Sequence, residues 1–206
     1  MLYQKEYTSI FHVHIPRTAG RYIRNIFLDN KFDGKYLSYD EFYRGIEVPH
    51  LHYPLYNDLS YVENSNHFAV VRDPFERFKS SMQLMIRAMN YPVELYDKLK
   101  DKDWLFNFLN HSRDYKQYHQ NHFRKQSDFI SARTHVYKFE DGLGIELIDW
   151  LNDRLNLDLN RTEYRYEIFH PHSISGEELP NKKDIDPIVE NCIRDYYSDD
   201  YENLKY

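Results

Sequence analysis

The 206-residue sequence has little cysteine, glycine or proline and no long apolar run. The single cysteine, Cys192, excludes an internal disulfide and a cysteine-based zinc site, and it favours a reducing compartment. Six glycines and eight prolines argue against a loop-rich scaffold. No segment approaches the roughly 20 apolar residues of a membrane span, and the first residues do not resemble a signal peptide. We therefore expect a soluble cytoplasmic protein that has no membrane partner.

Aromatic residues supply much of the apolar content, with 20 tyrosines and 13 phenylalanines in a chain that is 41% hydrophobic. A chain of this length and composition can bury a substantial core, which excludes a disordered or coiled-coil protein. The sequence contains no internal repeat, low-complexity segment or linker rich in proline and glycine. We therefore expect one domain over residues 1–206, while the oligomeric state stays open.

The net charge of −6 argues against a nucleic-acid partner. This charge is unevenly distributed, because residues 1–80 contain ten basic and ten acidic residues. The whole acidic excess falls in the later part of the chain. The cluster Arg17, Arg21 and Arg24 can therefore form an anion site despite the overall sign.

Short strand-like runs alternate with amphipathic helical segments along the chain. The strands are expected at residues 10–15, 68–71 and 135–139, and helices at residues 20–29, 74–89, 143–155 and 187–197. Asp73 and Asp186 are the expected N-caps of the second and fourth helices. Residues 94–125 are polar and expected to be helical in part. The alternation predicts an α/β fold of three layers, with a mainly parallel central sheet flanked by helices.

The loop at residues 16–22 joins the first predicted strand to the first predicted helix. A helix N-terminus offers unpaired backbone N–H groups and a favourable dipole to an anion. Gly20 allows close approach of a ligand, Thr18 offers a hydroxyl, and Arg17 and Arg21 offer charge. The alternative interpretation, a plain turn with surface arginines, fits this loop equally well. The loop does not have the spacing of a Walker A motif.

The second loop follows the buried strand that ends at Val71. Arg72 stands at the carboxyl end of this strand, where open α/β sheets bind ligands. Ser80 lies about 10 Å further along the helix axis, so the two side chains can bracket one phosphate. The alternative is that Arg72 pairs only with a nearby acidic residue.

Taken together, the two loops resemble those of sulfotransferases that use 3′-phosphoadenosine 5′-phosphosulfate (PAPS). Residues 15–20 resemble the 5′-phosphosulfate loop of that family, P-K-T-[AG]-[GS]-[ST]. Residues 72–80 are similar to its 3′-phosphate motif, R-D-P-x-x-R-x-x-S, at every defined position. Residues 122–126, 136–141 and 196–201 resemble further stretches of the family. The resemblance implies a P-loop NTPase-like sulfotransferase fold, with PAPS as sulfuryl donor and adenosine 3′,5′-bisphosphate as product. It implies these donor-binding residues: Arg17, Thr18, Ala19, Gly20, Arg21, Tyr22, Arg72 and Ser80.

Three positions depart from the family pattern. Arg17 replaces the usual lysine, which keeps the charge but presents a planar fork instead of a compact ammonium. Arg21 and Tyr22 replace the small hydroxyl residues that follow the glycine. Either Arg21 supplies the missing 5′-phosphate contact, or the donor is held differently.

Three of the histidine pairs have i, i+2 spacing: His12/His14, His50/His52 and His170/His172. No third ligand stands at a recognisable spacing, so we expect no metal. The pair His50/His52 lies between the two anion loops, as an H-x-H pair does in the heparan sulfate 2-O-sulfotransferase branch. That resemblance implies His52 as the general base and His50 as its helper, without separating their roles, and imidazole suits the task. Two solvent-facing loop histidines are the alternative.

The expected function is therefore in-line transfer of a sulfuryl group from PAPS to an acceptor hydroxyl, with Arg17 stabilising the transferring group. Two alternatives stay open: a nucleotide or small-molecule kinase on a P-loop-like fold, and a non-catalytic domain that binds an anion or a glycan. The acidic remainder of the chain disfavours a highly charged glycosaminoglycan acceptor. A saccharide or another small, weakly charged hydroxyl compound is the expected acceptor.

Overall fold

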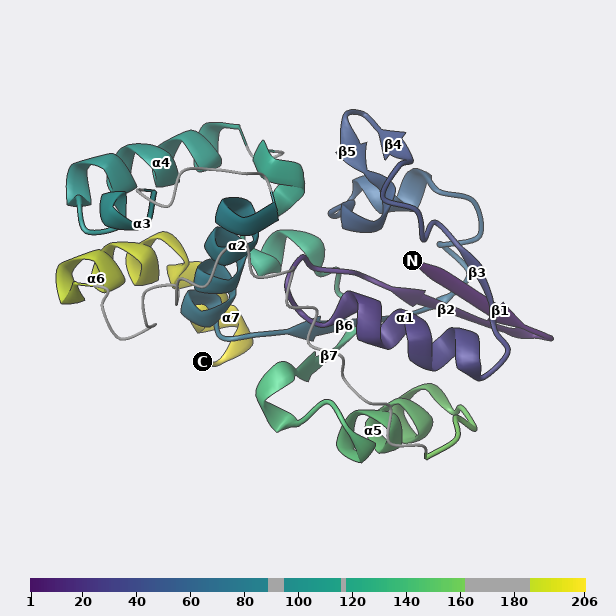
Figure 1. Ribbon diagram of the computed structural model, residues 1–206. Helices are drawn as coiled ribbons and strands as arrows, with labels where there is room; N and C mark the ends of the chain where they lie inside the picture. The colour runs from purple at the N-terminus through teal and green to yellow at the C-terminus, as the bar shows by residue number, and fades with distance from the viewer. Residues whose placement is uncertain (89–94, 116–117, 162–185) are drawn as a thin grey trace.

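A computed structural model describes residues 1–88, 95–115, 118–161 and 186–206 (Figure 1). The strands are β1 (Leu2–Lys5), β2 (Thr8–His12), β3 (Asp33–Lys35), β4 (Phe42–Tyr43), β5 (Ile46–Glu47), β6 (Asn66–Val71) and β7 (Thr134–Lys138). The α-helices are α1 (Gly20–Asp29), α2 (Pro74–Ala88), α3 (Leu95–Lys98), α4 (Lys102–Asp114), α5 (Ile145–Leu155), α6 (Pro187–Tyr196) and α7 (Ser198–Leu204). Short 3₁₀ turns are η1 (Val48–His50), η2 (Leu55–Asp58), η3 (Tyr118–Asn121), η4 (Gln126–Phe129) and η5 (Phe139–Asp141).

Within these residues the central sheet has five strands in the order β3-β1-β2-β6-β7. Strands β2, β6 and β7 pair in parallel, whereas β1 is antiparallel to both β2 and β3. A tight turn at Glu6 and Tyr7, with Glu6 in the left-handed region at φ 51°, folds β1 back on β2. The fold is therefore α/β as expected, but the sheet is mixed, which corrects the prediction of a mainly parallel sheet.

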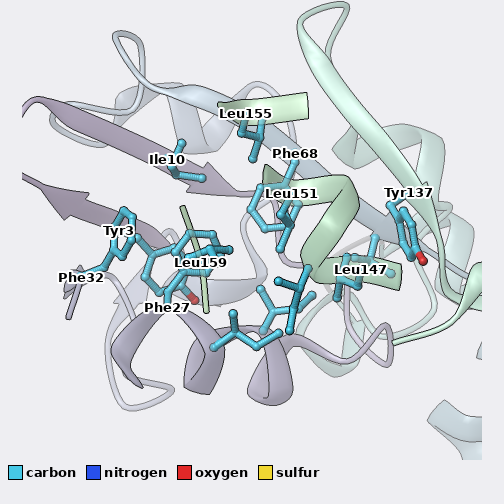
Figure 2. Close-up of a cluster of buried hydrophobic side chains, with 14 of the residues drawn as sticks. Tyr3, Ile10, Phe27, Phe32, Phe68, Tyr137, Leu147, Leu151, Leu155 and Leu159 are labelled. Atoms are coloured by element: carbon cyan, nitrogen blue, oxygen red, sulfur yellow. The ribbon is translucent and has the colours of Figure 1, made fainter. Parts of the chain in front are cut away.

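Helices α1 and α5 cover one face of the sheet (Figure 1). Figure 2 shows the core beneath them, in which aromatic rings from the strands meet leucines of α5. Tyr3 of β1 stacks on Phe27 of α1, with ring centroids 4.3 Å apart. The aromatic-rich composition thus appears directly as ring packing between sheet and helix.

The opposite face of the sheet is covered by irregular chain and short turns. Its core joins strand residues such as Phe11 and Val71 to Leu51 and Tyr56 of the segment between β5 and β6, and to Phe129 of η4. The Tyr56 hydroxyl donates to the backbone carbonyl of Phe129 at 3.0 Å. This packing fixes the segment that carries His50 and His52 against the sheet.

A group of helices (α2, α4 and α6) forms a separate core beyond the carboxyl end of β6 (Figure 1). Phe75, Phe78, Met82 and Met85 supply the α2 side of this core, as the apolar stripe in the sequence predicts. The last residue of that predicted stripe, Met89, lies outside the described residues.

Most predicted elements are confirmed within a few residues. Helix α1 has the predicted bounds, and Asp73 caps α2 by accepting from the Glu76 backbone N–H at 2.9 Å. Asp186 likewise caps α6 by accepting from the Ile188 N–H at 2.7 Å. The strand predicted at residues 10–15 ends at His12, although Val13 N–H still donates to Phe68. Among the described residues, no helix is both long and apolar enough to cross a membrane.

Candidate functional site

The two candidate loops leave neighbouring strands at the same edge of the sheet. Strand β2 pairs in parallel with β6, with His12 opposite Phe68, so the chain emerges from both strands side by side. Residues 13–19 connect β2 to α1, and Arg72 and Asp73 connect β6 to α2. The carboxyl edge of parallel strands is where α/β sheets place their ligands.

Arg17 of the first loop contacts Ser80 of the second motif. Its Nε donates to the Ser80 Oγ at 3.0 Å, across 63 residues of sequence. Arg17 and Ala19 both adopt left-handed backbone conformations, at φ 72° and 70°, so the loop is tightly wound. The buried Thr18 hydroxyl donates to the Ile15 carbonyl at 2.8 Å and closes this winding. The structure thus brings Arg17 and Ser80 together and gives Thr18 a role in shaping the loop.

Gly20 lies against the ring of His14. A Cβ atom at this position would stand 1.9 Å from His14 Nε2, so either the His14 ring or the loop would have to shift. Ala19 makes no side-chain cap, and the first turn of α1 has no acidic residue. The backbone at the start of α1 is therefore not neutralised by a local carboxylate.

Arg21 and Tyr22, which stand where the family pattern has small hydroxyl residues, have different surroundings. The exposed Arg21 lies over the Tyr39 ring, with its guanidinium carbon 5.8 Å from the ring centroid. Its guanidinium also donates a hydrogen bond to the Tyr39 hydroxyl. Burial nevertheless raises the pKa of Tyr39. Tyr22 is only 7% exposed and packs in the core between the sheet and its two covering helices. Arg21 is therefore the better placed of the two to meet a ligand.

Arg72 is held at its backbone by a buried glutamine. The Gln126 side-chain oxygen accepts from the Arg72 N–H at 3.0 Å, and its amide donates to the Arg72 carbonyl at 2.7 Å. The Arg72 guanidinium lies over the Phe139 ring at 4.7 Å, and its Nη2 is 4.0 Å from Glu76 Oε2. The predicted pairing with a local acidic residue is thus at the outer limit of an ion pair. That distance leaves the charge of Arg72 weakly compensated.

Arg77 is a residue whose role the sequence interpretation missed. It is fully buried, and its Nη1 and Nη2 donate to the carbonyls of His122 and Arg124 at 3.0 and 2.5 Å. The Ser81 hydroxyl, one turn later on α2, also donates to the His122 carbonyl, at 3.1 Å. The i, i+4 spacing of Arg77 and Ser81 was the available signal of a polar helix face. Arg77 therefore anchors the chain after η3 to α2.

Four buried histidine rings form a row beside the first loop. The centroid distances are 5.5 Å from His12 to His14, 4.9 Å from His14 to His50, and 5.3 Å from His50 to His122. Burial lowers the pKa of each of these side chains. The row is therefore uncharged at neutral pH.

The predicted catalytic pair has one buried and one half-buried member. His50 is 4% exposed, and its Nδ1 lies 2.8 Å from Glu47 Oε2. The pKa of His50 is lowered, and burial is the largest cause. The Glu47 carboxylate raises this pKa, whereas the positive charge of Arg17 lowers it further. The His14 ring, whose centroid is 4.9 Å from that of His50, places the chain that leads into the first loop close to His50.

No group of three or more histidine, cysteine, aspartate or glutamate side chains in the described ranges could hold a metal ion. The third predicted histidine pair, His170 and His172, lies outside those ranges. The arrangement therefore offers two arginines and a serine hydroxyl that can bind an anion, and neutral imidazoles that can accept a proton, at one sheet edge.

Comparison of the chain with protein-family models, curated proteins and solved structures gave no match.

Proposed function

We propose that the protein is a PAPS-dependent sulfotransferase with a P-loop-like fold. The contact between Arg17 and Ser80 is the observation that carries the proposal. The resemblance implies that the two motifs bind the 5′ and 3′ sides of one donor, which requires them to lie together. Their meeting at the carboxyl edge of β2 and β6 supports a shared ligand.

The fit of the donor is supported by the charges at this edge. Arg17 and the backbone at the start of α1 would hold the 5′-phosphosulfate, together with Thr18, Ala19, Gly20 and Arg21. Arg72 and Ser80 would hold the 3′-phosphate, since Arg72 is weakly compensated by Glu76. Tyr22 would contribute through the backbone, because its side chain is in the core.

The reaction would be in-line displacement at sulfur. When bound, the donor supplies both the sulfuryl group and the phosphate leaving group through its phosphate–sulfate linkage. Arg17 would stabilise the charge that develops on the transferring group and on the leaving 5′-phosphate oxygen. His50 or His52 would take the proton of the attacking hydroxyl. Most of the acceleration would come from positioning and electrostatic stabilisation, as in phosphoryl transfer.

A transfer assay with radiolabelled PAPS tests the proposal. The acceptors would be a panel of neutral oligosaccharides, phenols and a heparan sulfate fragment. We expect a labelled product from a weakly charged hydroxyl compound, and loss of at least about 100-fold in Arg17→Ala. Arg154→Ala, which removes an exposed arginine of α5, is the matched control and should keep full activity. Release of the bisphosphate without any sulfated product, or transfer from ATP in its place, would contradict the proposal.

A further inference from the structure

We infer that Glu47 positions His50 as the proton acceptor of the reaction, and that His52 does not hold that role. The inference rests on the proposed function and deepens it, because it names the base that the sequence left open. It assigns a role to Glu47, a residue that neither anion loop contains.

Glu47 and His50 are held in register by the fold. Glu47 ends β5, and the 3₁₀ turn η1 follows directly and brings His50 back over it. The Glu47 N–H donates to Gln120 Oε1 at 2.8 Å, and the His50 carbonyl accepts from Asn121 Nδ2 at 2.8 Å. Adjacent residues of η3 thus fix both ends of the pair.

The carboxylate selects the protonation state of the His50 ring. Glu47 Oε2 lies 2.8 Å from Nδ1, so the neutral imidazole keeps its proton on Nδ1 and its lone pair on Nε2. The contact is short but bent, since Nδ1 has no well-aligned hydrogen bond. Such contacts tighten when substrate binds and positive charge forms on the ring.

The other groups around His50 keep its ring neutral before reaction. The rings of His14, His122 and Tyr39 lie 4.9, 5.3 and 5.3 Å from it, and the Arg17 charge acts on it from the first loop. The Glu47 carboxylate acts in the other direction and raises the pKa of His50. A base must be neutral before it accepts a proton, and the carboxylate then stabilises the imidazolium.

In the His52 ring, the proton and the lone pair are on the opposite nitrogens from those in His50. Arg124 Nε donates to Asn121 Oδ1 at 3.0 Å, which fixes the orientation of the Asn121 amide. Asn121 Nδ2 therefore faces His52 Nδ1, at 3.3 Å, as a donor. A neutral His52 then uses its lone pair on this amide and carries its proton on Nε2. In this state it has no ring nitrogen left to accept a proton from substrate.

In the proposed step, the acceptor oxygen forms a bond to sulfur while the bond from sulfur to the 5′-phosphate oxygen breaks. The hydroxyl proton passes to His50 Nε2. The leaving adenosine 3′,5′-bisphosphate keeps the electron pair of the broken bond. Glu47 acts only through His50 and touches neither reactant.

The pH profile of kcat separates a positioning role from a structural one. Removing the carboxylate in Glu47→Gln should lower kcat about tenfold or more and move the acidic limb to lower pH, because the imidazole becomes less basic. Glu47→Asp should recover part of the rate, and Glu63→Gln, which alters an exposed glutamate, should match the wild type. His50→Ala should lower kcat more than His52→Ala. A wild-type acidic limb in Glu47→Gln, or the reverse order of the two histidine variants, overturns the inference.

A second measurement works without turnover. Nitrogen-15 shifts of the histidine rings report which nitrogen carries the proton in the free protein. The inference requires the Nδ1–H form at His50 and the Nε2–H form at His52, and a reversed assignment overturns it. If the wild type transfers no sulfuryl group, the proposed function fails, while these shifts still decide whether Glu47 sets the state of His50.

Discussion

Gly20 shows how closely a single residue constrains the first loop. The His14 ring occupies the space that any Cβ at position 20 would need. We expect Gly20→Ala to lower the free energy of unfolding by about 1–3 kcal/mol through overpacking, and to weaken anion binding because the loop must shift. Urea denaturation and calorimetry with adenosine 3′,5′-bisphosphate measure the two effects.

Gly144→Ala is the matched control for this substitution. A Cβ at Gly144 would meet only the end of the flexible Glu146 side chain, at 3.1 Å. Gly144 is the N-cap of α5, so the variant should lower the free energy of unfolding by about 1 kcal/mol, but it should leave anion binding unchanged. Equal effects of the two substitutions on anion binding would show that the contact of Gly20 with His14 does not constrain the loop.

Individual residues show which parts of the candidate site could be predicted from the sequence. Arg17 and Ser80 each belong to a readable motif, but their contact spans 63 residues and depends on the pairing of β2 with β6. Glu47 belongs to no motif, and it becomes significant only because η1 turns His50 back onto it. Local patterns predicted the loops, whereas tertiary packing determined which side chains meet.

At the scale of elements, helix α7 supports the loop that carries Arg72. The buried Asp200 of α7 accepts from the N–H groups of Gln126 and Ser127, both at 2.8 Å, and Gln126 in turn brackets the Arg72 backbone. Asp200→Asn should lower the free energy of unfolding by about 1–3 kcal/mol, because one N–H loses its acceptor to the amide NH2 group and the other keeps only a neutral oxygen. Chemical denaturation provides the measurement.

The neighbouring Asp199 provides an internal comparison. Its side chain is 58% exposed and pairs with Lys125 at the surface. Asp199→Asn should cost at most about 1 kcal/mol, as is typical of exposed ion pairs. If the two variants were equally stable, the hydrogen bonds of Asp200 would not be what stabilises the η4 turn against α7.

Helices were more predictable from the sequence than sheet edges. Asp73 with Pro74, and Asp186 with Pro187, are local start signals, and the helices begin where those signals stand. Strand β1 has no comparable signal, because it is fixed by pairing with β2 on one side and β3 on the other. The mixed character of the sheet therefore followed from long-range pairing that no local pattern carried.

For the whole molecule, buried neutral histidines make stability depend on pH. Burial lowers the pKa of His67 to about 4, and it also lowers the pKa values of His12, His14 and His122. Below the unfolded pKa of about 6.5, the unfolded chain binds more protons than the folded one. The free energy of unfolding should therefore fall as the pH drops from 7 through 5, as measured by denaturation at several pH values.

His12→Phe tests the source of this dependence. His12 stacks on Phe68 at 4.7 Å, and among the described residues neither of its ring nitrogens has a hydrogen-bond partner. Phenylalanine can thus replace the ring without the loss of a hydrogen bond, and the variant should show a shallower fall in stability at low pH. Stability that rises as the pH falls, or a slope unchanged in His12→Phe, would contradict this explanation.

If the two loops of this molecule bind one donor, a crystal structure with adenosine 3′,5′-bisphosphate should show both loops around the same nucleotide. We expect density for the nucleotide at the edge of β2 and β6, with its 5′-phosphate at Arg17 and its 3′-phosphate at Arg72 and Ser80. Density elsewhere on the molecule, or none at a saturating concentration, would contradict it.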